Sequence, residues 1–178
     1  MATPKDWDET LNISAEPIST ARLKLEPLRV DHARELAPVL DDESLHEFTG
    51  GRPLTAAEMT DLCRVRVTER SPDGRERWLN WVIRCDGEPI GYVQATVALV
   101  NHLMTADIAW VLASSGQGHG YAKEASGAMV AWLVLNGVTV VRAHIHPQHV
   151  ASASVARSLG LRPNGEVVDG ERRWELRY

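Results

Sequence analysis

The sequence predicts one mixed α/β domain whose elements follow the order β α α β β β α β α β β. The chain has 178 residues, and a single hydrophobic core usually serves chains of up to about 250 residues. Hydrophobic residues make up 44% of the sequence and charged residues 24%, which is typical of a folded globular protein and not of a disordered one. Runs rich in β-formers, joined by Asp-Gly turns, are interspersed with helical segments that end at glycines.

Charge, cysteine content and hydropathy exclude several classes of protein. Lys and Arg number 19 and Asp and Glu 24, so the net charge is −5, whereas a general nucleic-acid or anionic-membrane binder needs the opposite sign. The two cysteines, Cys63 and Cys85, are too few for a disulfide framework and lack metal-ligand spacing. The longest apolar stretch, 128–135, is far shorter than the ~20 residues of a membrane span. We therefore expect a cytoplasmic protein with reduced thiols, no metal, and no nucleic-acid or membrane contact.

The N-terminal part is predicted to be a lead-in followed by a strand and a short helix. Residues 1–19 carry one Lys against four carboxylates and show no periodicity, so we expect them to be an acidic, loosely ordered segment. The folded domain is expected to span 20–178. Polar and apolar residues alternate over 22–26 before a proline, which indicates a half-buried strand. Asp31 is expected to cap a short helix that ends near Leu40.

The middle of the chain predicts a second helix and then an antiparallel meander. Thr55 and Glu58 form a capping box, because the hydroxyl accepts from the backbone three residues on and the carboxylate reaches back. This helix is expected to end near Arg70. An Asp-Gly turn at Asp86 and Gly87 joins two β-rich runs, because both turn residues tolerate positive φ. The predicted strands are 78–85, 89–99 and 105–112.

The C-terminal part is predicted to alternate helices and strands and to end in a hairpin. A glycine-rich turn at 116–120 precedes a helical stretch that a glycine ends. A second Asp-Gly turn, at Asp169 and Gly170, predicts the last hairpin. The predicted elements are a helix over 121–136, a strand over 138–145, a helix over 151–159 and two final strands.

The turn with glycines at 116, 118 and 120 is a candidate anion site. A strand, a glycine-rich turn and a helix N-terminus place unpaired backbone N–H groups and the positive end of a helix dipole at one point. The small side chain of Ala122 leaves room for a phosphate. The same glycines also suit a tight strand-to-helix connection. The segment is not a Walker A loop, since no Lys-Ser or Lys-Thr follows.

Two motifs give the chain a resemblance to a known family. The sequence Gln-Gly-His-Gly-Tyr-Ala at 117–122 resembles the Q/R-x-x-G-x-G/A signature of the GCN5-related N-acetyltransferases, the GNAT superfamily. The run 146–152, followed by Ser-Leu-Gly-Leu at 158–161, resembles that family's P-x-N-x-A-S motif with its downstream L-G-F. The resemblance covers roughly 20–178 and is greatest to the branch that contains the ribosomal-protein-alanine N-acetyltransferases.

The resemblance implies a fold and a reaction. The fold is a central mixed, mostly antiparallel sheet with helices on both faces. Acetyl-CoA serves as the acetyl-donor cosubstrate and no metal takes part. A primary amine attacks the thioester directly in a ternary complex. Three hypotheses stay open. The acceptor is a protein N-terminal α-amine, which we favour, or a small-molecule amine of the aminoglycoside or polyamine type. In the third, the protein is a non-catalytic acyl-CoA binding module and has no acceptor. The oligomeric state is open too, a homodimer included.

The resemblance also implies cofactor-binding residues. The pyrophosphate loop maps to Gln117, Gly118, His119, Gly120, Tyr121 and Ala122, the pantetheine-pairing strand to Trp110, Val111 and Leu112, and the second motif to His149 and Ser152. Two positions depart from the family pattern. His149 stands where an Asn usually contacts the cofactor, and Ala156 stands where several relatives carry a Tyr that protonates the leaving thiolate.

Ser152 and Asp107 are the candidate catalytic residues. Ser152 either hydrogen-bonds the leaving thiolate or caps the following helix. Asp107 either accepts the ammonium proton, directly or through water, or has only a structural role. His144, with His146 on the same strand face, and Glu171 are further candidates for the acceptor groove or the base. An α-amine has a pKa of about 8 and a lysine about 10.4, so the lack of an obvious strong base favours an α-amine.

Overall fold

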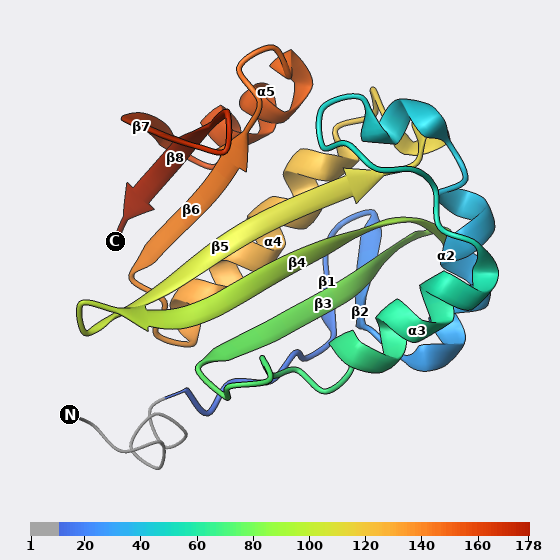
Figure 1. The fold of residues 1–178 in the computed structure, drawn as a ribbon, viewed down its shortest axis with the longest axis horizontal. Coiled ribbons are helices and arrows are strands. Elements are labelled where there is room, and N and C mark those ends of the chain that lie inside the picture. Colours follow the sequence, from blue (N-terminus) through green and yellow to red (C-terminus); the bar gives the residue numbers. More distant parts are fainter. Residues whose placement is uncertain (1–10) are drawn as a thin grey trace.

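The computed structural model describes residues 11–178 and shows one open, twisted sheet with helices on both faces (Figure 1). The sheet has eight strands in the order β1-β2-β3-β4-β5-β6-β8-β7. All neighbouring strands are antiparallel except β5 and β6. The strands are β1 Ile18–Ser19, β2 Leu23–Pro27, β3 Glu76–Cys85, β4 Glu88–Val100, β5 Leu103–Leu112, β6 Val140–Ile145, β7 Arg162–Val168 and β8 Glu171–Arg177. The α-helices are α2 Ala33–Val39, α3 Ala56–Arg66, α4 Tyr121–Leu135 and α5 Val150–Ser158. The mixed, mostly antiparallel fold class predicted from the sequence is confirmed.

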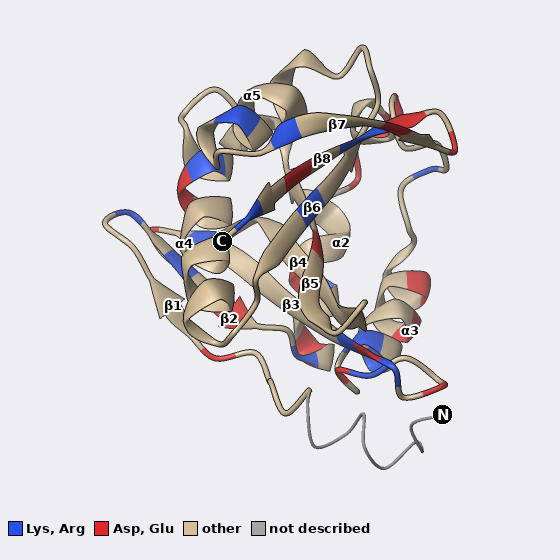
Figure 2. Ribbon diagram, turned by 90° about the vertical axis from the view of Figure 1, so that its left-hand side faces the viewer, with Lys and Arg blue, Asp and Glu red and all other residues tan. Residues whose placement is uncertain are grey.

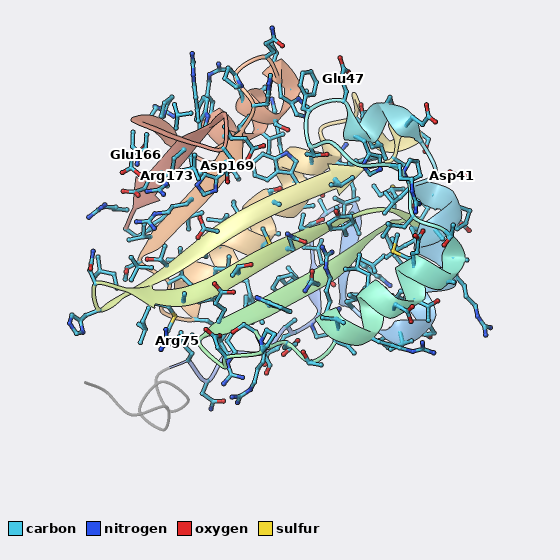
Figure 3. All side chains as sticks on the ribbon, in the orientation of Figure 1. Asp41, Glu47, Arg75, Glu166, Asp169 and Arg173 are labelled. Atoms are coloured by element: carbon cyan, nitrogen blue, oxygen red, sulfur yellow. The ribbon has the colours of Figure 1, made fainter. Side chains whose placement is uncertain are left out.

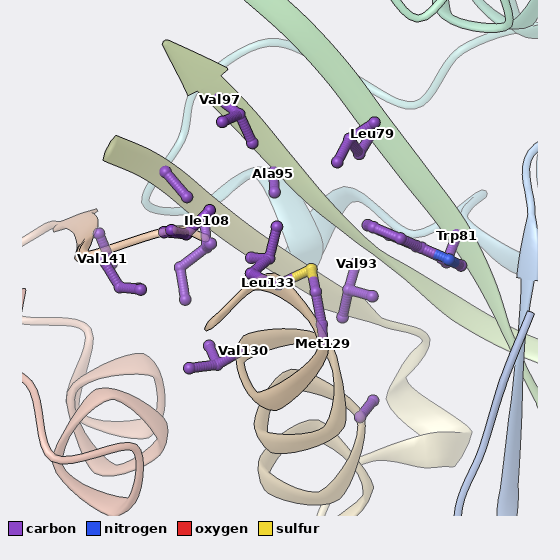
Figure 4. Packing of buried hydrophobic residues seen from close by; sticks show 14 of the residues in the cluster. Leu79, Trp81, Val93, Ala95, Val97, Ile108, Met129, Val130, Leu133 and Val141 are labelled. Atoms are coloured by element: carbon purple, nitrogen blue, oxygen red, sulfur yellow. The ribbon is translucent and has the colours of Figure 1, made fainter. Parts of the chain in front are cut away.

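The main core lies between the sheet and α4 (Figure 4). Met129 and Leu133 of α4 are fully buried against the inward-facing residues of β3, β4 and β5, such as Trp81, Val93 and Ile108. Alternate residues of the same strands face the other side, where α2 and α3 cover part of the sheet in a second cluster. Because α2 and α3 lie at one end of the strands (Figure 1), these two helices leave the remainder of that face of the sheet uncovered.

The expected loosely ordered lead-in is wrong for residues 11–19. Leu11 and Ile13 are buried, and β1 adds a strand at the sheet edge by pairing with β2. Arg77 Nε donates to the Leu11 carbonyl at 2.6 Å and Trp81 Nε1 donates to the Glu16 carbonyl at 2.8 Å. Two apolar side chains and a few backbone carbonyls suffice to order this segment, despite its acidic composition. The rest of the expected lead-in, 1–10, lies outside the described residues.

The first helical region also differs from the prediction, whereas the second agrees closely. A 3₁₀ turn at Val30–His32 precedes α2, and Asp31 pairs with Arg29 instead of capping a helix. The capping box is confirmed: Glu58 N donates to Thr55 Oγ1 at 3.3 Å and Thr55 N donates to Glu58 Oε2 at 2.9 Å. The helix ends at Arg66, one turn earlier than expected.

Both predicted Asp-Gly hairpins are present. The φ angles are 51° and 88° at Asp86 and Gly87, and 51° and 84° at Asp169 and Gly170. Positive φ at both positions is the type I′ geometry that suits the right-handed twist of a hairpin.

The strands β5 and β6 diverge at the centre of the sheet. They pair only from Thr105 to Asp107 on β5, whereas β4 follows β5 as far as Leu112. Within residues 11–178, the edge of β5 that faces β6 therefore has no strand partner over 108–112. This separation opens the sheet beside the glycine-rich turn.

Candidate active site

A cavity of about 1020 Å³ lies at the strand divergence. Its walls come from the ends of β4, β5 and β6, from the turn before α4, from the start of α5, from α3, and from the loop that carries Phe48. Figure 3 shows Glu47 of that loop beside α5, with Asp169 and Arg173 on the β7–β8 hairpin. The cavity thus joins the predicted cofactor residues to the predicted acceptor groove.

The turn before α4 has the geometry of an anion cradle. Gly120 precedes the first residue of α4 with φ 79°, and no side chain caps the helix there. Gly118 also has φ 79°, and a Cβ built on it would meet nothing within 4 Å. The first-turn N–H groups therefore face open space at the positive end of the α4 dipole. The turn at 118–122 therefore remains a candidate anion site, with open space at Gly118 and a helix N-terminus behind it.

The side chain of Gln117 is hydrogen-bonded to the end of β5. Its Nε2 donates to the carbonyl of Leu112 at 3.0 Å, which ties the end of β5 to the turn. This amide supports the loop from within, so any contact of Gln117 with a phosphate comes from its backbone.

Arg22 supports the turn from outside, and sequence reasoning missed it. Its guanidinium lies 2.6 Å from a carboxylate oxygen of Glu124, donates to the His119 carbonyl at 3.0 Å, and lies 4.7 Å from the centre of the Tyr121 ring. Glu124 also accepts from the Thr20 hydroxyl at 2.6 Å, and these hydrogen bonds hold the pKa of its carboxyl below the usual value. No local signal reveals this contact, because about a hundred residues separate Arg22 from the turn.

His149, and not Ser152, caps α5. The ring Nδ1 of His149 accepts from the Ser152 backbone N–H at 3.5 Å, and Phe48 stacks on the same ring with a centroid distance of 4.4 Å. Burial lowers the pKa of His149, which favours the neutral ring that this hydrogen bond requires. The alternative that Ser152 is the cap is wrong, so its hydroxyl is left to line the cavity. Ala156 is fully buried, so the family's Tyr has no equivalent there.

Asp107 lies where β5 leaves β6. Its side chain is 44% exposed, yet its Oδ1 is buried and has no hydrogen-bond partner among residues 11–178. The Nδ1 of His144 is 3.8 Å from that oxygen. Arg173 Nε donates to His144 Nε2 at 3.3 Å, so the neutral ring carries its proton on Nδ1, toward Asp107. Burial raises the pKa of the Asp107 carboxyl, and the nearby His144 opposes that shift.

Gln94 adds a second unpartnered oxygen that sequence reasoning did not find. It lines the cavity from β4, and its Oε1 is buried without a partner. Gln94 pairs in register with Ala109, two residues from Asp107 on β5. Side chains two residues apart on a strand share a face, so both unpartnered oxygens lie on the same side of the sheet.

The remaining predicted residues also border the cavity. Trp110 packs on the main core and Val111 on the second cluster. The ring of His146 lies 5.4 Å from that of Phe48, and its Nδ1 accepts from the Gln148 backbone at 3.2 Å. The predicted residues that line the cavity are Trp110, Val111, Leu112, Gln117, Gly118, Gly120, Tyr121, Ala122, His144, His146, His149, Ser152 and Glu171. Asp107 and His119 are not part of its lining, but Asp107 borders it through His144, whose Nδ1 lies 3.8 Å from Asp107 Oδ1.

Residues 22–162 match the family model described as an acetyltransferase (GNAT) domain. The chain belongs to the GNAT acetyltransferase family. As a member of that family the enzyme is an acetyl-CoA-dependent N-acetyltransferase. A search of the curated proteins finds no match to this chain.

Solved structures of GNAT enzymes share its fold. RimL, a ribosomal-protein α-N-acetyltransferase in complex with coenzyme A, has a TM-score of 0.78 at 18% identity and covers 91% of this chain and 98% of its own. An aminoglycoside acetyltransferase with coenzyme A gives 0.73 at 20%, covering 87% and 94%. Mycobacterium smegmatis RimJ with a CoA-disulfide gives 0.73 at 22%, covering 91% and 87%. At these identities the similarity concerns the fold.

Two further findings concern metals and membranes. Within residues 11–178, no three or more His, Cys, Asp or Glu side chains gather in a way that suits a metal ion. None of the helices in this part of the chain is long and apolar enough to cross a membrane.

Proposed function

We propose that this GNAT enzyme acetylates the N-terminal α-amine of a protein or peptide. The observation that carries the proposal is the Asp107 carboxylate, which sits at the β5–β6 divergence with one oxygen buried and unpartnered. An amine that reaches the acetyl group from the open face of the sheet finds this oxygen, and that of Gln94, as acceptors for its N–H groups.

Binding of the acetyl donor is assigned to the turn and to β5. The backbone N–H groups of 118–122 hold the pyrophosphate, and the free edge of β5 at Trp110, Val111 and Leu112 pairs with the pantetheine amides. When bound, acetyl-CoA supplies an activated thioester carbonyl. The protein then accelerates the reaction largely by fixing the amine beside that carbonyl.

Proton transfer is assigned to two side chains. The amine nitrogen forms a bond to the acetyl carbon, the carbon–sulfur bond breaks, the amine loses a proton and the thiolate gains one. Asp107, with its pKa raised by burial, accepts the proton from the amine, and the His144 Nδ1–H stabilises the carboxylate beside it. Ser152 is free of the capping role, so its hydroxyl is assigned to the leaving thiolate.

The weakness of this base favours an α-amine over a lysine. The two amines have pKa values of about 8 and 10.4. Removing a proton from the lysine at neutral pH therefore requires about 3.3 kcal/mol more. The protein N-terminal acceptors of RimL, as that protein's name states, agree with this preference.

A second candidate is a small polycationic amine. Three carboxylates favour it, because Glu47 and Glu171 line the cavity and Asp107 borders it. An aminoglycoside acetyltransferase is also among the proteins with this fold.

The test is thiol release from acetyl-CoA with a panel of acceptors. The panel contains peptides with free Ser, Ala or Met N-termini, the same peptides with a blocked N-terminus and one lysine, spermidine, and an aminoglycoside. Release with the free N-termini alone supports the proposal. Release with spermidine or the aminoglycoside alone supports the second candidate, and tight donor binding without release from any acceptor indicates a non-catalytic acyl-CoA binding module.

A further inference from the structure

One cation in the acceptor groove has no carboxylate partner. Arg66, in the last turn of α3, is half-buried, lines the cavity, and lies with its guanidinium 5.7 Å from the centre of the Tyr92 ring. No ion pair to Arg66 is found within residues 11–178. Arg64, two residues earlier, is 64% exposed and pairs with Asp61 at 2.9 Å. The two arginines share a helix end, but of the two only Arg66 lines the cavity.

The unpartnered oxygens of Gln94 and Asp107 lie toward the opposite end of the groove. Tyr92, Gln94 and Thr96 are alternate residues of β4 and share a face, and Thr96 pairs in register with Asp107. From Tyr92 to Thr96 is four strand residues, or about 13 Å. The groove therefore has a positive end at Arg66 and a negative end at Asp107.

This polarity orients an acceptor that carries both charges. A guanidinium over an aromatic ring is pre-organised to bind a carboxylate through two parallel N–H groups. If the amine lies at Asp107, an anionic group on the same molecule meets Arg66 at the Tyr92 end of the groove, about 13 Å away along β4. A polycation would instead place a second positive charge against Arg66 in a half-buried groove, where like charges repel.

We propose that Arg66 selects peptide acceptors that carry an acidic side chain at position 3 or 4. An extended peptide advances at most about 3.3–3.6 Å per residue, so an N-terminal amine at Asp107 brings the side chain of residue 3 or 4 to Arg66. This inference rests on the proposed function, since it takes the acceptor to be an N-terminal α-amine. The ring of Tyr92 holds the guanidinium in place.

The test compares peptides that differ only in charge. A Ser-Ala-Ala peptide series carries Glu, Gln or Lys at position 3, at position 4 or at position 8, and kcat/KM is measured for each at saturating acetyl-CoA. The expected result is that Glu at position 3 or 4 raises kcat/KM about tenfold over Gln, the effect of one charge-assisted hydrogen bond in a partly solvated groove. Lys at that position should lower kcat/KM, and position 8 should have no effect. The preference for Glu should weaken as salt is raised.

Variants assign the preference to Arg66. Arg66→Met should reduce the Glu-to-Gln ratio to about one, Arg66→Lys should keep part of it, and Arg66→Glu should reverse it in favour of Lys. Arg64→Met is the matched control, because it removes an arginine from the same helix turn but outside the cavity, and the ratio should stay as in the wild type. A merely structural role of Arg66 at the helix end would alter the melting temperature but not this ratio.

The outcomes separate the two proposals. If every peptide is acetylated with equal kcat/KM, the charge selection by Arg66 is wrong and the proposed function stands. If the Glu preference persists in Arg66→Met, another residue selects the acidic side chain and the inference is wrong. If no peptide is acetylated while the enzyme turns over a small amine, both proposals are wrong.

Discussion

Replacing Arg22 by Met tests how the glycine-rich turn before α4 is held. The change removes a guanidinium that joins Glu124, the His119 carbonyl and the Tyr121 ring. The Arg22 side chain is 48% exposed, so the ion pair contributes at most about 1 kcal/mol after solvent screening. The hydrogen bond to the carbonyl and the contact with the ring each contribute about 0.5–1 kcal/mol at such a site.

These contributions come from one side chain and do not simply add, so we expect a total of about 2 kcal/mol. Without Arg22 the turn has to be ordered when the donor binds, and this cost appears as weaker binding. A loss of about 2 kcal/mol corresponds to a rise of up to about 30-fold in the Kd for acetyl-CoA. The apparent affinity of the acceptor peptide should change little, because Arg22 lies outside the acceptor groove.

The assay is titration calorimetry with coenzyme A, together with KM values for donor and acceptor and the melting temperature. Lys24→Met is the matched control: it removes the same charge two residues away, and Lys24 is exposed. Donor affinity in Lys24→Met should match the wild type. An unchanged Kd in Arg22→Met would refute the reasoning, and an equal loss in both variants would mean that net charge, and not the contacts of Arg22, attracts the donor.

Three further predictions concern the site. Gly120→Glu places a side chain where φ is 79°, with its Cβ 3.6 Å from Arg22 Nη2, and adds a negative charge to the turn. Donor binding measured by calorimetry should be lost while the far-ultraviolet circular dichroism stays native. Wild-type affinity would rule out the turn as the phosphate site. Ser152→Ala should lower kcat about tenfold or more without an equal rise in the donor KM. The melting temperature should not fall, since His149 is the cap of α5. A loss of stability with kcat unchanged would show that the hydroxyl is only structural. Asp107→Asn should lower kcat/KM by about 10²–10³-fold and flatten the acid limb of the pH profile. Because the pKa of Asp107 is raised in the folded enzyme, the ionised carboxylate destabilises the fold at pH values above that pKa. The free energy of unfolding at pH 7 should therefore rise in Asp107→Asn. Lower stability together with wild-type kcat/KM would show that the carboxylate is structural.

Much of the fold could be predicted because its signals are local. The capping box of Thr55 and Glu58 and the two Asp-Gly turns depend on residues within four positions of each other. Backbone sterics and short-range hydrogen bonds therefore produce them in any context. The glycines at 118 and 120 belong to the same class, since positive φ and room for an anion are properties of the turn itself. The order of the elements follows from these signals.

The missed features depend on long-range contacts. Leu11 and Ile13 pack in a core whose strand residues come much later in the sequence. Arg22 contacts a turn about a hundred residues away. His149 caps α5, and Phe48 from a distant loop stacks on its ring. No sequence window contains both partners of these pairs.

The family, the donor and a candidate anion-binding turn follow from the sequence, because the glycine signature is a property of a few consecutive residues. Only the tertiary structure placed the unpartnered oxygens of Gln94 and Asp107 on one face and Arg66 beyond them. Each of these side chains is an ordinary polar residue of a strand or a helix in the sequence. Their chemistry arises from burial and from distances across the sheet, which the folded chain alone sets.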